Sequence, residues 1–175
     1  MRRFFLLFPF AFTVWGFPAW GADQETETSR FLQEVYTQPP AADTLWLTRE
    51  LRPAVRSIME HDYPAARLRY WRAGLRTAWV LEEIGKEMPI TVGIAVDNDA
   101  VERVRVLVYR ESRGWEVQNP AFTAQFAGAR LTPRQDLDRT IDGISGATLS
   151  VRALNRLTRL ALLLHRQVVA GGSKP

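Results

Sequence analysis

The run Asp142–Thr148, with the sequence Asp-Gly-Ile-Ser-Gly-Ala-Thr, holds the residues whose types and spacing are best suited to chemistry. Its small residues let a ligand approach the backbone closely. If a helix starts at Thr148, its first N–H groups are free and the positive end of its dipole lies behind them, which suits a phosphate. The Thr148 hydroxyl can then bond that phosphate by a hydrogen bond or an ester, and Arg152 adds charge one turn later. From the residues alone, an ordinary helix capped by Ser145 or Thr148 remains the simpler alternative.

The elements that position this run include a predicted set of strands. Segments 67–73 and 77–82 are rich in aromatic and β-branched residues and are separated around Gly74, as in a hairpin. Residues 90–96 alternate between apolar and small or polar side chains, which predicts a strand with one apolar face. After an Asp-Asn-Asp turn, residues 101–109 predict another strand, with Val104, Val106 and Val108 directed inward.

Predicted helices complete the fold class. Thr48 is a suitable N-cap for a helix that runs to about Glu60, and a helical turn is expected over 31–36. Residues 122–126 suit a short helix, and residues 148–169 form a long helix with an apolar stripe. The sequence therefore predicts an α+β fold: an antiparallel sheet with packed helices and a long C-terminal helix.

Composition limits the classes of function. The chain has 175 residues, enough for one domain with a substantial core, and 46% of them are hydrophobic. It has no cysteine, which excludes disulfides, thiolate metal sites and iron–sulfur clusters. Its two histidines lack ligand spacing, so we expect no metal site. The net charge is +4, but acidic and basic residues are mixed along the chain, which argues against a nucleic-acid partner.

The N-terminal residues indicate export. Arg2-Arg3 precede an uncharged apolar stretch over 4–17, and small residues follow, so residues 1–21 are predicted to be a signal peptide cut after Gly21 or Ala22. A retained membrane anchor is the alternative, although the stretch is shorter than a spanning helix needs. Residues 22–46 are expected to be a polar leader, flexible at its start, and the predicted location is the periplasm or the extracytoplasmic face.

A family resemblance adds to this interpretation. The pattern Asp-x-x-Ser-Gly-Ala-Thr over 142–148 resembles the flavinylation motif of the FMN-binding domain family, whose members include flavin-bearing components of the sodium-pumping quinone reductase and of the Rnf complex. Residues 88–96 look like the family's central strand. Residues 109–114 resemble its Glu-Thr-Pro-Gly segment near the flavin, from which this chain departs at Ser112 and Arg113. The resemblance implies that residues 47–175 form an FMN-binding domain.

The resemblance also assigns roles to residues. It implies that Thr148 carries FMN covalently through a phosphoester, attached by a separate flavin transferase that uses FAD and magnesium. The remaining residues expected to bind the cofactor are Asp142, Gly143, Ser145, Gly146, Ala147, Glu111, Ser112, Gly114 and Trp115.

Two of these residues have alternative roles. Asp142 either shapes the loop by accepting bonds from the amides of 143–145 or helps to place the metal during flavin transfer. Glu111 is a hydrogen-bond partner of either the flavin or nearby backbone, and no residue is expected to be catalytic. Aromatic cover for the flavin ring is expected from Trp115 before the other candidates, which are Tyr70, Trp71, Trp79 and Phe122.

The function implied is an extracytoplasmic flavoprotein that carries electrons, with a membrane-bound redox protein or cytochrome as donor or acceptor. One alternative is a small periplasmic flavin-dependent reductase acting on a quinone or metal complex. A second is a non-catalytic protein that docks on a membrane redox complex as one of its subunits.

Overall fold

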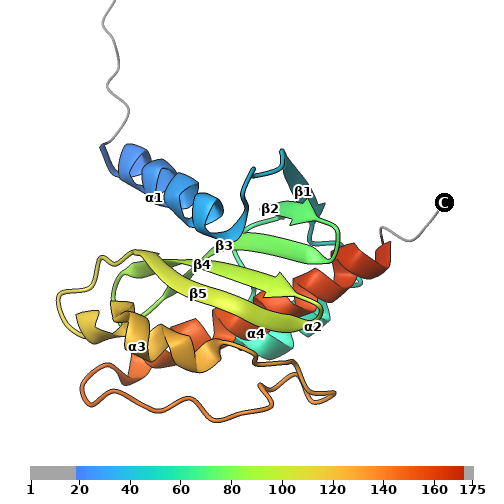
Figure 1. Cartoon of the computed structure of the whole chain (residues 1–175). Coiled ribbons are helices and arrows are strands. Elements are labelled where there is room, and N and C mark those ends of the chain that lie inside the picture. The colour runs from blue at the N-terminus through green and yellow to red at the C-terminus, as the bar shows by residue number, and fades with distance from the viewer. Residues whose placement is uncertain (1–18, 172–175) are drawn as a thin grey trace, which may run out of the picture.

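A computed structural model describes residues 19–171 of the chain as one sheet with helices on both faces (Figure 1). In chain order the elements are α1 (Ala19–Val35), β1 (Ala42–Trp46), α2 (Arg52–Met59), β2 (Arg67–Ala73), β3 (Arg76–Ile84), β4 (Pro89–Asp97), β5 (Ala100–Val108), the 3-10 helix η1 (Trp115–Gln118), α3 (Pro120–Thr123), the 3-10 helix η2 (Ala124–Phe126) and α4 (Thr148–Gly171). The predicted α+β class, with an antiparallel sheet and a long C-terminal helix, is confirmed.

The sheet has the strand order β1-β2-β3-β4-β5, and every neighbouring pair is antiparallel. The predicted hairpin around Gly74 joins β2 to β3. The Asp-Asn-Asp turn joins β4 to β5 with Asn98 at φ 49° and Asp99 at φ 62°. Both residue types tolerate this left-handed backbone, and two such residues in succession match the twist of a tight hairpin. The sheet from β2 to β5 is therefore built from sequential hairpins.

One face of the sheet packs against α4 and α2 and contains the main core. Trp79, Ile94 and Leu157 are fully buried there. The expected apolar stripe of α4, Leu157, Leu160, Ala161, Leu164 and Val168, is buried as predicted. Burial of side chains as large as leucine contributes about 1.5–3 kcal/mol each, so this core fixes α4 relative to the sheet.

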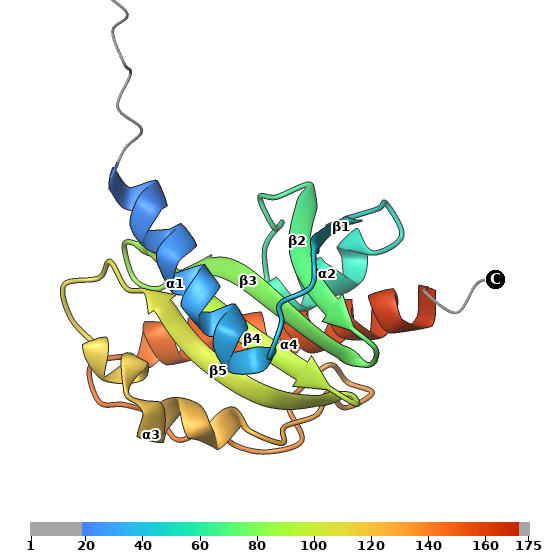
Figure 2. The same cartoon turned by 45° about the horizontal axis from the view of Figure 1, so that its top comes forward.

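The other face is covered by α1 (Figure 2), which makes a second, smaller core. Phe31 is fully buried against Gly93 of β4, where an added Cβ would lie 2.8 Å from the phenylalanine ring. Glycine at this position therefore lets the helix approach the strand. At the helix surface, Glu27 pairs with Arg105 of β5 at 2.9 Å.

Residues 22–46 are not the expected polar leader. They form most of α1, the connection that follows it and strand β1. The short turn predicted over 31–36 is the last part of α1, and the folded domain begins well before residue 47. Residues 1–18 of the predicted signal peptide lie outside the described residues, whereas residues 19–21 begin α1.

Two local predictions also need correction. Helix α2 begins at Arg52 rather than after Thr48, and no side chain caps it. The backbone oxygen of Thr48 accepts the Arg52 N–H at 3.1 Å, so residues 48–51 form a turn before the helix. Val108 packs against the α1 core rather than the main core, because the register of β4 and β5 shifts between Thr91 and Val92.

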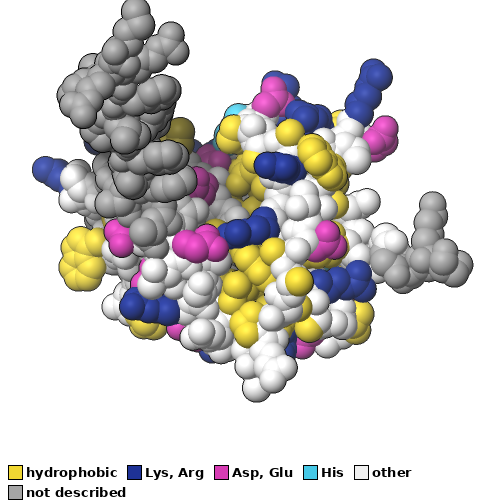
Figure 3. All heavy atoms as spheres, turned by 90° about the horizontal axis from the view of Figure 1, so that it is seen from above, with side chains coloured by type: hydrophobic (Ala, Val, Ile, Leu, Met, Phe, Trp, Pro, Cys, Tyr) yellow, Lys and Arg dark blue, Asp and Glu magenta, His cyan; other side chains and the backbone are white. Residues whose placement is uncertain are grey.

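Within residues 19–171, no helix combines the length and apolar character that a membrane span requires. Figure 3 shows that basic, acidic and apolar side chains are interspersed on the face seen from above.

Candidate functional site

The run 142–148, here called the attachment run, ends in a tight turn that leads into α4. The Ala147 N–H donates to the Ile144 oxygen at 3.0 Å, and Gly146 at the third position of this turn has φ +82°. That backbone is strained for residues with a Cβ, although the space around Gly146 is open. The glycine is therefore required by the turn itself, which directs the chain into the helix at Thr148.

The first turn of α4 presents free backbone donors. The first intrahelical bond runs from the Val151 N–H to the Ala147 oxygen at 2.9 Å. The N–H groups of Thr148, Leu149 and Ser150 have no acceptor among residues 19–171. Thr148 is exposed, so its hydroxyl, which belongs to the same first turn as these donors, is accessible to solvent. As expected from the sequence, the arrangement suits a phosphate or another anion.

A cleft of about 550 Å³ adjoins this helix start. It is lined by the β3–β4 connection, the segment after β5 and the first turn of α4, with residues Lys86, Glu87, Glu111, Ser112, Arg113, Gly146, Ala147, Thr148, Leu149 and Ser150. A second groove of about 440 Å³ runs along α4 on the other side of Thr148 and includes Arg139, Arg152 and Arg159. Thr148 thus borders both hollows.

The β3–β4 connection is held in place by Glu111. Its Oε1 accepts the backbone N–H groups of Lys86, Glu87 and Met88 at 2.5, 2.7 and 3.0 Å. Burial opposes ionisation of this carboxyl, but the three N–H bonds and the Lys86 charge outweigh it and lower the pKa of Glu111 below its ordinary value. Residues 85–88 and 109–114, joined in this way, are called the cleft wall below.

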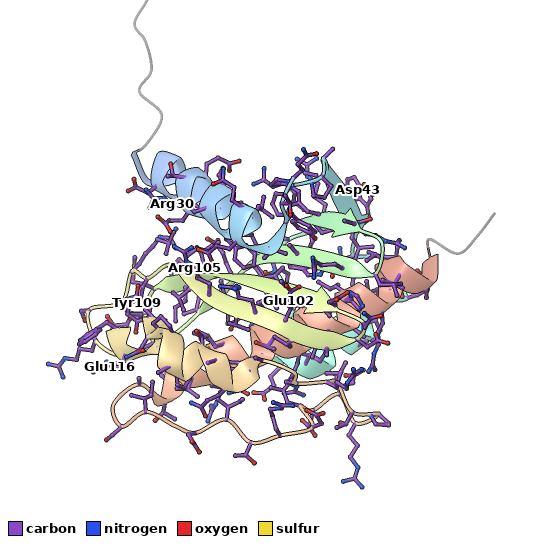
Figure 4. All side chains as sticks on the ribbon, in the orientation of Figure 1. Arg30, Asp43, Glu102, Arg105, Tyr109 and Glu116 are labelled. Atoms are coloured by element: carbon purple, nitrogen blue, oxygen red, sulfur yellow. The ribbon has the colours of Figure 1, made fainter. Side chains whose placement is uncertain are left out.

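The cleft wall also contacts α4. Gly114 has φ +80°, and a Cβ there would lie 2.9 Å from the Ala147 Cβ and from the Tyr109 hydroxyl. Tyr109, labelled in Figure 4, donates its hydroxyl to the Arg113 oxygen at 2.5 Å. The Ser150 Oγ lies 3.1 Å from the same tyrosine oxygen, and since the single tyrosine proton is used, Ser150 is the donor. Burial raises the pKa of Tyr109, so it stays protonated and keeps this role.

The structure brings together only some of the residues predicted for the site. Those that line the cleft are Glu111, Ser112, Gly146, Ala147 and Thr148. Gly114 packs behind the cleft, and Trp115 is 64% exposed beside it without being part of its lining. Gly143 and Ser145 are exposed parts of the attachment run.

Asp142 does not make the loop bonds that were one of its two expected roles. Its N–H donates to the Gln125 Oε1 at 2.8 Å. Its carboxylate accepts no hydrogen bond from any of residues 19–171. The carboxylate is exposed and free, which leaves the metal-placing role as the remaining expectation.

The other aromatic candidates for ring cover are core residues. Tyr70 stacks on fully buried Trp79 with ring centroids 4.9 Å apart, Trp71 packs under α1, and Phe122 makes an edge contact with Phe126. They stabilise the fold and do not line the cleft.

Sequence reasoning missed Lys86, Glu87, Arg113, Leu149 and Ser150 as lining residues. The sequence did contain an indication that Lys86 and Glu87 lie at the site. In a sheet of sequential hairpins the β3–β4 turn and the end of β5 lie at the same edge, so the Gly-Lys-Glu turn had to lie near Glu111. Gly85 adds a second indication, because a Cβ there would lie 2.8 Å from the Glu111 Oε1.

Comparison with known proteins agrees with this geometry. Residues 85–163 match the family model of the FMN-binding domain, which supports FMN binding by this part of the chain. The match spans the whole cleft, and the resemblance inferred from the motif is confirmed.

A solved structure shares the fold. The crystal structure of Shewanella oneidensis NqrC matches with a TM-score of 0.63 at 13% sequence identity, over 86% of this chain and 98% of that chain. Among curated protein sequences, none matches the chain significantly.

Proposed function

We propose that this protein is an extracytoplasmic electron carrier that bears FMN as a phosphoester on Thr148. The observation that carries the proposal is the exposed Thr148 hydroxyl, which belongs to the same first turn as three free backbone donors, at the edge of a cleft within the region that matches the FMN-binding domain. FMN supplies the redox chemistry, since it accepts and releases one or two electrons. The protein supplies attachment, orientation and tuning.

The residues present fit this cofactor. The free N–H groups of residues 148–150 are available to an anion at the helix start, where the helix dipole favours a phosphate. The cleft lining combines polar side chains such as Lys86 and Ser112 with apolar Leu149, which suits a ring with one apolar and one polar edge. Leu149 is 42% exposed and lines the cleft, so it is the apolar side chain best placed to cover a ring there.

Exposure of Thr148 also supports maturation by a separate enzyme. A flavin transferase that uses FAD and magnesium is the proposed partner, and it needs access to the acceptor hydroxyl. The free Asp142 carboxylate lies six residues before this hydroxyl and is a hard oxygen ligand of the kind that Mg²⁺ prefers. We assign Asp142 to placing the metal during transfer. The proposed donor or acceptor of electrons is a membrane-bound redox protein or cytochrome.

The test is an intact-mass measurement on the protein exported from cells that co-express a flavin transferase. Transfer from FAD releases AMP, so the wild type is expected to gain the mass of one FMN less one water, mapped to the peptide that contains Thr148. Thr148→Ala is expected to lose it completely, and Thr148→Ser to retain it because serine keeps the hydroxyl.

Ser145→Ala is the matched control, because it removes an exposed hydroxyl from the same run and should keep the FMN. Covalent FMN in Thr148→Ala, or its absence from the wild type, would contradict the assignment. Detection of the wild type only in the cytoplasm would contradict the proposed location.

A further inference from the structure

Arg113 occupies an unusual position in the cleft wall. It is exposed, it lines the cleft, and its side chain forms no hydrogen bond or ion pair with residues 19–171. Its backbone, in contrast, is fixed, because its oxygen accepts the Tyr109 hydroxyl at 2.5 Å. The next residue, Gly114, is in close contact with Ala147. The structure therefore holds an unpaired guanidinium next to the start of α4.

The other charged groups of the cleft form no ion pair with Arg113. Glu111 uses one carboxylate oxygen for three backbone N–H groups, and Glu87 pairs with Lys86 at 3.2 Å. Of the two cationic side chains that line the cleft, Lys86 and Arg113, only Arg113 has no acidic partner among residues 19–171.

We propose that Arg113 sets how strongly the site favours reduced over oxidised FMN, by placing a positive charge against the flavin. This inference rests on the proposed function, since it requires FMN in the cleft. It concerns the redox potential of the bound FMN, a quantity that attachment through Thr148 does not determine.

The physical reason is the change of charge on reduction. Two electrons and one proton convert the uncharged oxidised ring to a ring with one negative charge. A cation on the cleft wall attracts that charge and has no comparable interaction with the oxidised ring. The effect is moderated because Arg113 is exposed and screened by water and salt. We expect Arg113 to favour the reduced form about five- to tenfold, which for a two-electron couple corresponds to about 20–30 mV.

The test uses the flavinylated holoprotein and compares Arg113→Gln, Arg113→Lys and Arg113→Pro with the wild type. Two quantities are measured: the midpoint potential by spectroelectrochemistry, and the dissociation constant of sulfite, which adds to the oxidised ring and leaves negative charge on it. Arg113→Gln and Arg113→Pro are expected to lower the potential and to weaken sulfite binding about five- to tenfold. Arg113→Lys is expected to keep a midpoint potential and a sulfite affinity close to those of the wild type, because lysine keeps the positive charge.

The matched control is Arg67→Gln, since Arg67 is also exposed and unpaired within residues 19–171 but does not line the cleft. It should leave both quantities unchanged. Proline is tolerated at position 113 as far as hydrogen bonding is concerned, because the Arg113 N–H has no acceptor among these residues and its oxygen remains available to Tyr109.

A flavinylated Arg113→Gln protein with wild-type potential and sulfite affinity would overturn the inference. So would an equal change in Arg67→Gln, since the effect would then be that of net charge. Failure of the proposed function looks different, because the wild type would then carry no FMN mass at all.

Discussion

The cleft wall and the attachment run form two sides of one site, yet they are built differently. In the cleft wall, the Glu111 carboxylate accepts hydrogen bonds from three backbone N–H groups, and Gly114 is packed so closely that a Cβ would not fit. In the attachment run, Asp142 has a free carboxylate, and an added Cβ at Gly143 would meet no atom within 4 Å. The contrast matches the two tasks that the proposed function assigns: the run would be accessible to a modifying enzyme, while the wall would hold a fixed environment against the cofactor.

The largest expected difference between the two sides comes from adding a methyl group to a glycine. Gly114→Ala places a Cβ 2.9 Å from Ala147 and Tyr109 on a backbone at φ +80°, so we expect a loss of about 2–4 kcal/mol in the free energy of unfolding. Gly143→Ala meets open space and should stay within about 0.5 kcal/mol of wild type. Urea denaturation of both variants measures the difference. Equal stabilities would show that the wall is not packed as described.

A smaller effect is expected from Glu111→Gln. The amide keeps an oxygen for the three N–H donors but loses the negative charge that strengthens those bonds, so we expect a loss of about 1–2 kcal/mol at neutral pH. Glu116→Gln is the control, because its exposed carboxylate accepts no hydrogen bond from residues 19–171.

The sign of the pH dependence sharpens this prediction. The pKa of Glu111 is lowered by folding, so its contribution is present above the ordinary glutamate pKa and is lost as the pH falls through the folded value. The difference in the free energy of unfolding between Glu111→Gln and the wild type should therefore be smaller in acid. Urea denaturation at neutral and at acidic pH measures it. A difference that is independent of pH would contradict the ionised role of Glu111.

The smallest effects are expected from His165 and His61, which do not line the cleft and should act in opposite directions on stability. The pKa of buried His165 is lowered mainly by desolvation, so stability falls as the pH drops below 6.5, where the unfolded state takes up a proton first. The pKa of His61 is raised by its bond to the Asp62 oxygen and by Glu83, so its contribution is present below 6.5 and is lost as the pH rises through the folded pKa.

Unfolding free energies of His165→Gln and His61→Gln, measured from about pH 5 to about pH 8, test this. The free energy of unfolding of the wild type should increase with rising pH relative to that of His165→Gln. Relative to that of His61→Gln, it should decrease with rising pH. If both stability differences changed with pH in the same direction, the opposite pKa shifts of His165 and His61 would be contradicted. Because neither residue lines the cleft, FMN attachment should be unaffected in both variants.

The sequence predicted the parts of the fold whose apolar residues repeat with a clear period. The hairpins and α4 were predicted because alternation and a helical stripe are local patterns. Strand β1 was missed because it is an edge strand whose side chains are nearly all exposed, so it shows no alternation. Helix α1 was only partly predicted because its first half is polar and its buried residues cluster after Thr28.

The site was predictable where one short segment determines it. The start of α4 at Thr148 and the glycine turn before it follow from residues close together in the chain. Lys86 lines the cleft, and Glu111 holds the β3–β4 connection by accepting its N–H groups. Both features depend on contact between segments that are more than 20 residues apart in the chain. Contacts of that kind follow from the strand order and not from any local motif.

Helix α1 begins at the same end of the sheet as the cleft, although it lies on the opposite face. Gln24 accepts a hydrogen bond from Arg110 at 3.4 Å, and Asp23 lines a small hollow together with Met88. The chain therefore enters the fold next to the cleft wall. If residues 1–21 are kept as the membrane anchor weighed above, the tether attaches beside the cleft wall and limits the distance of the cleft from the bilayer. If the predicted cut after Gly21 or Ala22 is made, the new amino terminus and its positive charge lie next to Asp23 and Gln24, beside the cleft wall.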